Sequence, residues 1–132
     1  MSLTEVPAER RILETAFAFR VSRILLTAVE LGVFTELGKG PRTCGQLCRA
    51  LGLEETAAPD LLDALVALGF LERDGMDARA IYLNTRAGAR CLDANAPASL
   101  ENVLQQAARA YGTWGRLTEL LRAGRPSPAQ RL

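Results

Sequence analysis

The order of patterns between residues 43 and 84 restricts the fold of this chain more than any other feature. Thr43 and Gln46 form a capping box, in which the threonine hydroxyl and the glutamine side chain bond to amide groups of a first helical turn. Apolar residues then recur at helical spacing up to Gly52, a residue type that commonly ends a helix. The sequence therefore predicts a helix over residues 44–51.

A second helix and a hairpin follow directly. Pro59 suits the first helical position, and apolar residues at helical spacing continue up to Gly69. Two short apolar runs, residues 70–73 and 79–83, flank a turn and indicate a β-hairpin. Helix, turn, helix and hairpin in this order predict a winged helix-turn-helix core in a mainly α-helical protein.

The charge of the second helix argues against the DNA binding that is common for this shape. DNA readers place that helix in the major groove, with cations near phosphates and base edges. Here residues 58–67 include Asp60 and Asp63 and no lysine or arginine. Arg73 and Arg79 of the hairpin have acidic neighbours. Sixteen basic and fifteen acidic residues leave a net charge of +1, which gives no field to attract a polyanion. We expect no nucleic-acid partner.

Length and residue usage predict one domain in a reducing compartment. A chain of 132 residues can bury roughly two thirds of its unfolded surface. No apolar run reaches ~18 residues and no secretory leader is recognisable, so we expect a cytoplasmic protein without a membrane partner. With no histidine, the cysteines at 44, 48 and 91 are expected to be apolar fillers, and we predict no metal site.

Residues 12–32 predict a helix that is apolar around most of its circumference. Its polar residues fall on one narrow arc, namely Arg20, Arg23, Thr27 and Glu30. One small domain cannot easily cover so much apolar surface, which favours a second copy of the chain as the covering layer. The alternative is a central helix wrapped by its own domain.

A long helix is also predicted at the other end, beginning at Ser99. Its apolar residues advance by three or four positions along one face, which we call the α-seam: Leu100, Leu104, Ala107, Tyr111, Trp114, Leu117 and Leu121. Gly112 and Gly115 lower helix stability and predict a bend or break. Trp114, the single tryptophan, is expected either to anchor the core or to form the wall of a ligand pocket.

The expected organisation is one winged-helix-like dimerisation domain over residues 1–124. Residues 125–132 contain two prolines and are expected to be a truncated linker or tail. The fold class is thus mainly α, with a winged helix-turn-helix core, a small β-hairpin, and long N- and C-terminal helices that dimerise.

Five segments in this order resemble the N-terminal domain of S-adenosylmethionine-dependent small-molecule O-methyltransferases, which include plant caffeate-type and bacterial natural-product enzymes. They are T-A-V-E-L-G-V-F-T-E-L at 27–37, G-P-R-T-C-G-Q-L-C-R-A-L-G at 40–52, L-L-D-A-L-V-A-L-G-F-L at 61–71, Y-L-N-T-R-A at 82–87 and W-G-R-L-T-E-L-L-R-A-G at 114–124. The resemblance implies a homodimer held by the first and last helices. It also implies that the domain contributes to the wall of a pocket for a small aromatic or polyketide-like substrate.

The same resemblance implies a following Rossmann-like domain that holds S-adenosylmethionine and commonly a histidine base. This chain has no histidine and no glycine-rich cofactor turn. We therefore predict no catalytic residue, no cofactor-binding residue and no activity for the chain alone. Candidate dimer or substrate-pocket contacts are Phe17, Phe19, Tyr111 and Trp114.

Two other functions remain compatible with these patterns. A stand-alone dimeric winged-helix transcriptional regulator has the same helix-turn-helix and hairpin layout. A stand-alone protein that binds a small molecule without chemistry has the same apolar helices. The acidic second helix and the series of family-like segments favour the dimerisation and substrate-pocket module over both.

Overall fold

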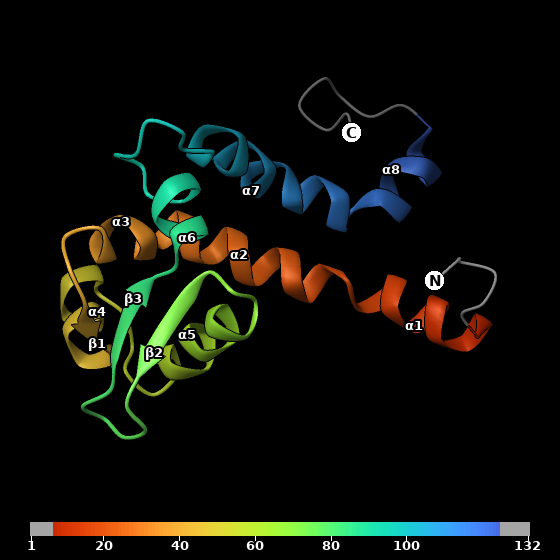
Figure 1. Cartoon of the computed structure of the whole chain (residues 1–132). Helices are drawn as coiled ribbons and strands as arrows, with labels where there is room; N and C mark the ends of the chain where they lie inside the picture. Colours follow the sequence, from red (N-terminus) through yellow and green to blue (C-terminus); the bar gives the residue numbers. More distant parts are fainter. Residues whose placement is uncertain (1–6, 125–132) are drawn as a thin grey trace.

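The computed structural model describes residues 7–124 and shows a mainly helical chain with one small antiparallel sheet (Figure 1). The elements in chain order are α1 Ala8–Phe17, α2 Phe19–Leu31, α3 Val33–Leu37, β1 Arg42–Thr43, α4 Cys44–Leu51, α5 Ala58–Ala67, β2 Leu71–Asp74, β3 Ile81–Asn84, α6 Arg86–Cys91, α7 Glu101–Gly115 and α8 Leu117–Ala123. Helices α2 and α7 pack side by side, whereas α1 extends away from the end that holds the sheet (Figure 1).

The first predicted helix is interrupted at Ala18, which corrects the expectation of one helix over 12–32. Ala18 keeps right-handed helical angles, but its N–H bonds to the Thr15 carbonyl at 3.4 Å, three residues back. Bonding of this kind tightens a helical turn. The chain therefore continues from α1 into α2 with a local change of winding, and Gly32 ends α2 at a φ of 82°.

Helix α4 begins as the sequence predicts. The Gln46 amide donates to the Thr43 hydroxyl at 3.2 Å, and the Thr43 amide donates to the Gln46 side chain at 2.9 Å. Gly52 ends the helix at a φ of 70°. In α5, Pro59 is the second helical residue instead of the first, because the helix begins at Ala58.

The hairpin is confirmed, with each strand beginning later than predicted. Strand β3 lies between β1 and β2, with Arg42 and Arg73 both opposite Tyr82 in antiparallel register. Strand β1 is missing from the sequence prediction. It has two residues, so it carries no recognisable alternation and depends on pairing with β3.

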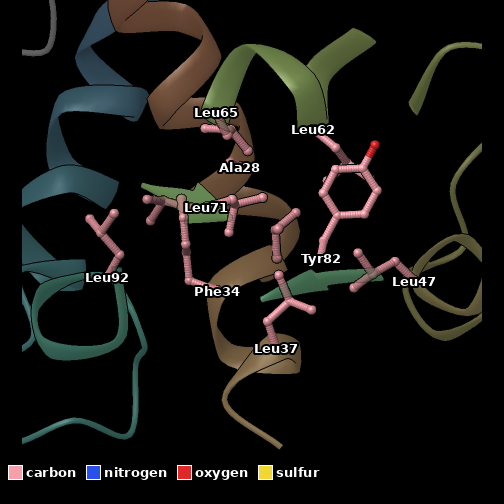
Figure 2. Packing of buried hydrophobic residues seen from close by; sticks show 11 residues of the cluster. Ala28, Phe34, Leu37, Leu47, Leu62, Leu65, Leu71, Tyr82 and Leu92 are labelled. Atoms are coloured by element: carbon pink, nitrogen blue, oxygen red, sulfur yellow. The ribbon is translucent and has the colours of Figure 1, made fainter. Parts of the chain in front are cut away.

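The core lies where α2, α3, α4 and α5 meet the sheet (Figure 2). Phe34 is fully buried at its centre, and its neighbours in Figure 2 are Ala28, Leu37, Leu47, Leu62, Leu65, Leu71, Tyr82 and Leu92. Cys48 is also buried, as the expectation of an apolar filler requires.

The last predicted helix breaks where its glycines indicate. Helix α7 ends at Gly115 and α8 begins at Leu117, with Arg116 between them. The predicted tail at 125–132 lies outside the described residues. Within residues 7–124, no helix has the length and apolarity to cross a membrane.

Candidate apolar groove between the first and last helices

A groove of about 590 Å³ lies between α2 and α7. The groove exists because several side chains on α7 are small, and aromatic rings form its borders. The lining residues are Phe19, Ser22, Leu26, Ala107, Ala110, Tyr111, Trp114 and Gly115. Its volume falls in the range of ligand pockets, roughly 300–1,000 Å³. Among the described residues its lining supplies two hydroxyls and no charged group, so it is suited to apolar contact rather than acid–base chemistry.

Three of the four candidate residues meet in this groove. Phe19 comes from α2, and Tyr111 and Trp114 come from α7. Phe17 lies on α1, outside the lining, with 45% of its surface exposed. Trp114 is 53% exposed, so it does not anchor the core of this chain and instead forms a wall of the groove.

Tyr111 fixes one end of the groove. Its hydroxyl donates to the Phe19 carbonyl at 3.1 Å, which joins α7 to the start of α2. The Arg23 guanidinium lies 5.2 Å from the centre of the Tyr111 ring, and it also contacts Glu30 at 3.3 Å. These contacts hold the Tyr111 ring in place while the Trp114 ring stays exposed.

Exposed apolar side chains also lie outside the groove, on α1 and on the neighbouring helices. No residue of α1 is buried, although the helix carries large apolar side chains. The exposed members on α1 and α2 are Ile12, Leu13, Phe17, Phe19 and Val21, and on or beside α7 and α8 they are Leu100, Val103, Trp114 and Leu121. We call this set, with the groove lining, the helix face. Apolar surface gathered in this way marks an interaction site.

A second cluster joins α5 to the hairpin and corrects the expected surroundings of Arg73. Its guanidinium lies 3.0 Å from both Asp63 carboxylate oxygens, so its partner is on α5 and not in the hairpin. The Tyr82 hydroxyl donates to the same carboxylate at 2.7 Å. Burial, then this bond to Asp63, raises the pKa of Tyr82 to about 12. Asp63 is thus a link between elements, a role that the acidic pattern of α5 did not reveal.

Cys44 lies beside that cluster and stays a thiol. Its sulfur is 3.9 Å from the Cys48 sulfur, one helical turn away. Burial, then the contact with Cys48, raises the pKa of Cys44 to about 11. A protonated, half-buried thiol is a poor nucleophile, in keeping with the packing role expected of it.

Comparison with known proteins identifies the family. The model of the O-methyltransferase dimerisation domain matches residues 13–94. The chain belongs to this family. Over 122 residues it is 43% identical to the tetracenomycin polyketide synthesis 8-O-methyl transferase TcmO of Streptomyces glaucescens, covering 92% of this chain and 35% of that protein. Over 128 residues it is 33% identical to human acetylserotonin O-methyltransferase, covering 95% and 37%.

A solved structure extends the likeness to the fold. The crystal structure of human N-acetylserotonin methyltransferase in complex with SAM matches with a TM-score of 0.81 at 31% identity, over 96% of this chain and 38% of that chain. The chain thus spans about a third of the length of the relatives it matches. It is an O-methyltransferase dimerisation domain. The family model ends at residue 94, before α7, so it covers the α2 wall of the groove and not the α7 wall.

Sequence reasoning missed some of the groove residues. Ala107, Tyr111 and Trp114 were on the predicted α-seam, but Ser22 and Ala110 were not singled out. Both have small side chains, which carry little signal in a pattern based on large apolar residues. Their contribution is the space between two helices, which depends on how those helices pack.

Proposed function

We propose that this chain is the dimerising and substrate-pocket module of an S-adenosylmethionine-dependent O-methyltransferase that acts on the hydroxyl of a small molecule. In this proposal residues 1–124 form a winged-helix-like dimerisation domain, with β2 and β3 as the wing, and residues 125–132 are a truncated linker or tail. The exposed helix face of α1, α2, α7 and α8 carries the proposal, because it offers an apolar surface that residues 7–124 leave uncovered.

The partner in this proposal is a second copy of the chain, bound through the first and last helices. Helix α1 contributes Ile12, Leu13 and Phe17, each of which is at least 45% exposed. Fully burying an apolar side chain of this size contributes about 1.5–3 kcal/mol, and roughly half of that remains to be gained where half of the side chain is already covered. Several such residues from each of two copies together offset the cost of association. The match to the family of O-methyltransferase dimerisation domains supports the same assignment.

The groove has a second role in the proposal, as part of the wall around the acceptor substrate. Phe19, Tyr111 and Trp114 present aromatic surface, and Phe17 lies on the adjoining helix. A flat aromatic or polyketide-like acceptor stacks well against such rings. The module would then orient the acceptor hydroxyl and keep water from it, which are the contributions of a binding wall to group transfer.

S-adenosylmethionine itself does not fit the groove. Its sugar and charged groups need carboxylate and backbone partners, typically at a glycine-rich turn before a helix. The groove residues, all of them between positions 19 and 115, supply two hydroxyls and aromatic or aliphatic surface. We therefore assign the methyl donor and the base to a catalytic portion beyond this chain, and expect no methyl transfer by the chain alone.

Sedimentation of the chain with two matched variants tests the dimer. Leu13→Asp places a charge on α1, where no residue is buried, so the fold of its own chain is not disturbed. Met76→Asp is the control, because Met76 is 95% exposed in the turn between β2 and β3. We expect the native chain and Met76→Asp to be dimers at tens of micromolar and Leu13→Asp to be a monomer. A monomeric native chain, or a fully dimeric Leu13→Asp, would contradict the proposal.

Trp114 offers a test of the pocket. A planar polyphenol is expected to quench its fluorescence, and Ala110→Leu is expected to weaken this quenching because it fills part of the groove one helical turn before the ring. Exposed Ala98 provides a control, since Ala98→Leu adds the same bulk outside the groove. Equal quenching in the native chain, Ala110→Leu and Ala98→Leu would contradict the proposal that Trp114 forms part of a binding pocket.

A further inference from the structure

A second hollow, of about 440 Å³, lies between α6 and the loop that leads to α7. Its lining consists of Arg86, Ala89, Arg90, Ala96, Pro97 and Ala98, and none of these residues lines the α2–α7 groove. The dimer proposed above neither uses this surface nor needs it. The hollow is therefore a surface separate from the one assigned to the dimer.

The helical wall of this hollow is held firmly against the core. Gly88 is buried in α6, and a Cβ atom there would lie 2.5 Å from the Phe70 carbonyl oxygen, so the helix backbone very closely approaches the residue that precedes β2. The Thr85 hydroxyl also donates to the Gly69 carbonyl at 2.8 Å. These contacts leave α6 little freedom to shift.

The loop wall is tied down by backbone bonds on either side of Pro97. The Ala94 amide donates to the Thr35 hydroxyl at 3.0 Å, which attaches the start of the loop to α3. The Leu100 amide donates to the Cys91 carbonyl at 2.7 Å, which attaches its end to α6. Both walls are therefore preformed, which lowers the entropy cost of binding a partner.

The charge of the hollow is entirely positive. Arg86 and Arg90 stand one helical turn apart on α6, which has no acidic residue. Over the part of the chain that the structure describes, the ion pairs formed by other arginines do not involve these two. The remaining lining side chains, those of Ala89, Ala96, Pro97 and Ala98, are apolar. The hollow thus combines two guanidinium groups with an otherwise apolar lining.

We propose that this hollow docks an acidic amphipathic helix of another protein. Carboxylates one turn apart on such a helix have the same spacing as Arg86 and Arg90, with Cβ atoms about 5–6 Å apart. Each guanidinium can bind a carboxylate through two parallel hydrogen bonds. An apolar residue between the two carboxylates would enter the hollow. A free small anion would contact exposed arginines alone and gain little, which favours the helix.

Binding of a designed peptide to the full chain tests this assignment. The probe is a fluorescently labelled peptide of four Glu-Leu-Ala-Ala repeats, which places glutamates one turn apart beside leucines. Arg86→Gln combined with Arg90→Gln removes the charges, and Arg49→Gln is the control because Arg49 is an exposed arginine near the end of α4. Circular dichroism verifies that each variant is folded.

We expect polarisation to show at least about tenfold weaker binding by the double variant and unchanged binding by Arg49→Gln. A peptide with glutamine in place of glutamate is expected to bind no better than the double variant binds the probe. Equal binding by the double variant and the native chain overturns the proposal. So does displacement of the probe by inorganic phosphate, at matched ionic strength, more strongly than by chloride, since that result indicates a small-anion site.

Discussion

Replacing Gly88 by alanine distinguishes local helix propensity from tertiary packing, because the two predict changes of opposite sign in the free energy of unfolding. Gly88 lies inside α6 and its φ is not positive, so propensity alone predicts that alanine stabilises the helix by about 1 kcal/mol. The structure places the added Cβ 2.5 Å from the Phe70 carbonyl oxygen and 3.5 Å from the Phe34 ring. A backbone carbonyl cannot rotate away, so α6 must move.

That movement strains the bond from the Thr85 amide to the same Phe70 carbonyl, now 3.2 Å long. Overpacking costs roughly 1–3 kcal/mol, and a clash with a backbone atom that cannot rotate away belongs in the upper part of this range, at about 2–3 kcal/mol. After the gain of about 1 kcal/mol in propensity, we expect a net loss of about 1–2 kcal/mol in the free energy of unfolding. Gly45→Ala is the control, because its Cβ would meet only the Glu55 side chain at an ordinary 3.7 Å.

Urea unfolding of the three proteins at one fixed protein concentration measures the difference, since dimerisation makes stability concentration-dependent. We expect Gly45→Ala to match or slightly exceed the native chain. A Gly88→Ala protein as stable as the native chain would refute the reasoning, because the close approach of α6 to Phe70 would then not be a packing constraint.

Three further changes probe the polar contacts. Burial raises the pKa of Tyr82 from 10.0 to about 12 and that of Cys44 from 9.0 to about 11. As the pH rises, the unfolded chain therefore loses these two protons before the folded chain does. In a pH series of urea melts, the free energy of unfolding is expected to be unaffected below about pH 9 and to fall between about pH 9 and 12. Asp63→Asn removes the carboxylate charge that both Tyr82 and Arg73 contact. We expect a loss of about 1 kcal/mol in the free energy of unfolding by urea and a lower pKa of Tyr82 in an ultraviolet titration. An unchanged titration would contradict the contact between Tyr82 and Asp63. Thr43→Ala removes the hydroxyl of the capping box and is expected to cost about 0.5–2 kcal/mol in the same melts, whereas Thr43→Ser should restore most of it.

Most of the local structure could be predicted because its signals lie within a few residues of each other. The capping box at Thr43, the glycine at position 52 and the glycines near the end of α7 act on their own helical turns, and the structure confirms all three. Strand β1 could not be predicted in this way, since two residues become a strand only by pairing with β3.

The candidate site was predictable in part. Phe19, Tyr111 and Trp114 were chosen as large apolar residues on the two long helices, and they meet in the groove. The role of Asp63 was not predictable, because its partners Arg73 and Tyr82 lie ten and nineteen positions away and become neighbours when the hairpin folds over α5.

The sequence by itself therefore determined the helices, their caps, the hairpin, and a surplus of apolar surface on the first and last helices, because these depend on residue type and short-range spacing. The tertiary structure decided where that surplus lies. The packing of α2 against α3, α5 and α7 buries the end of α2 near Ala28 and leaves α1 and Trp114 exposed. Which side of an apolar helix is covered depends on its neighbours in space, and a periodic pattern along one chain contains no information on them.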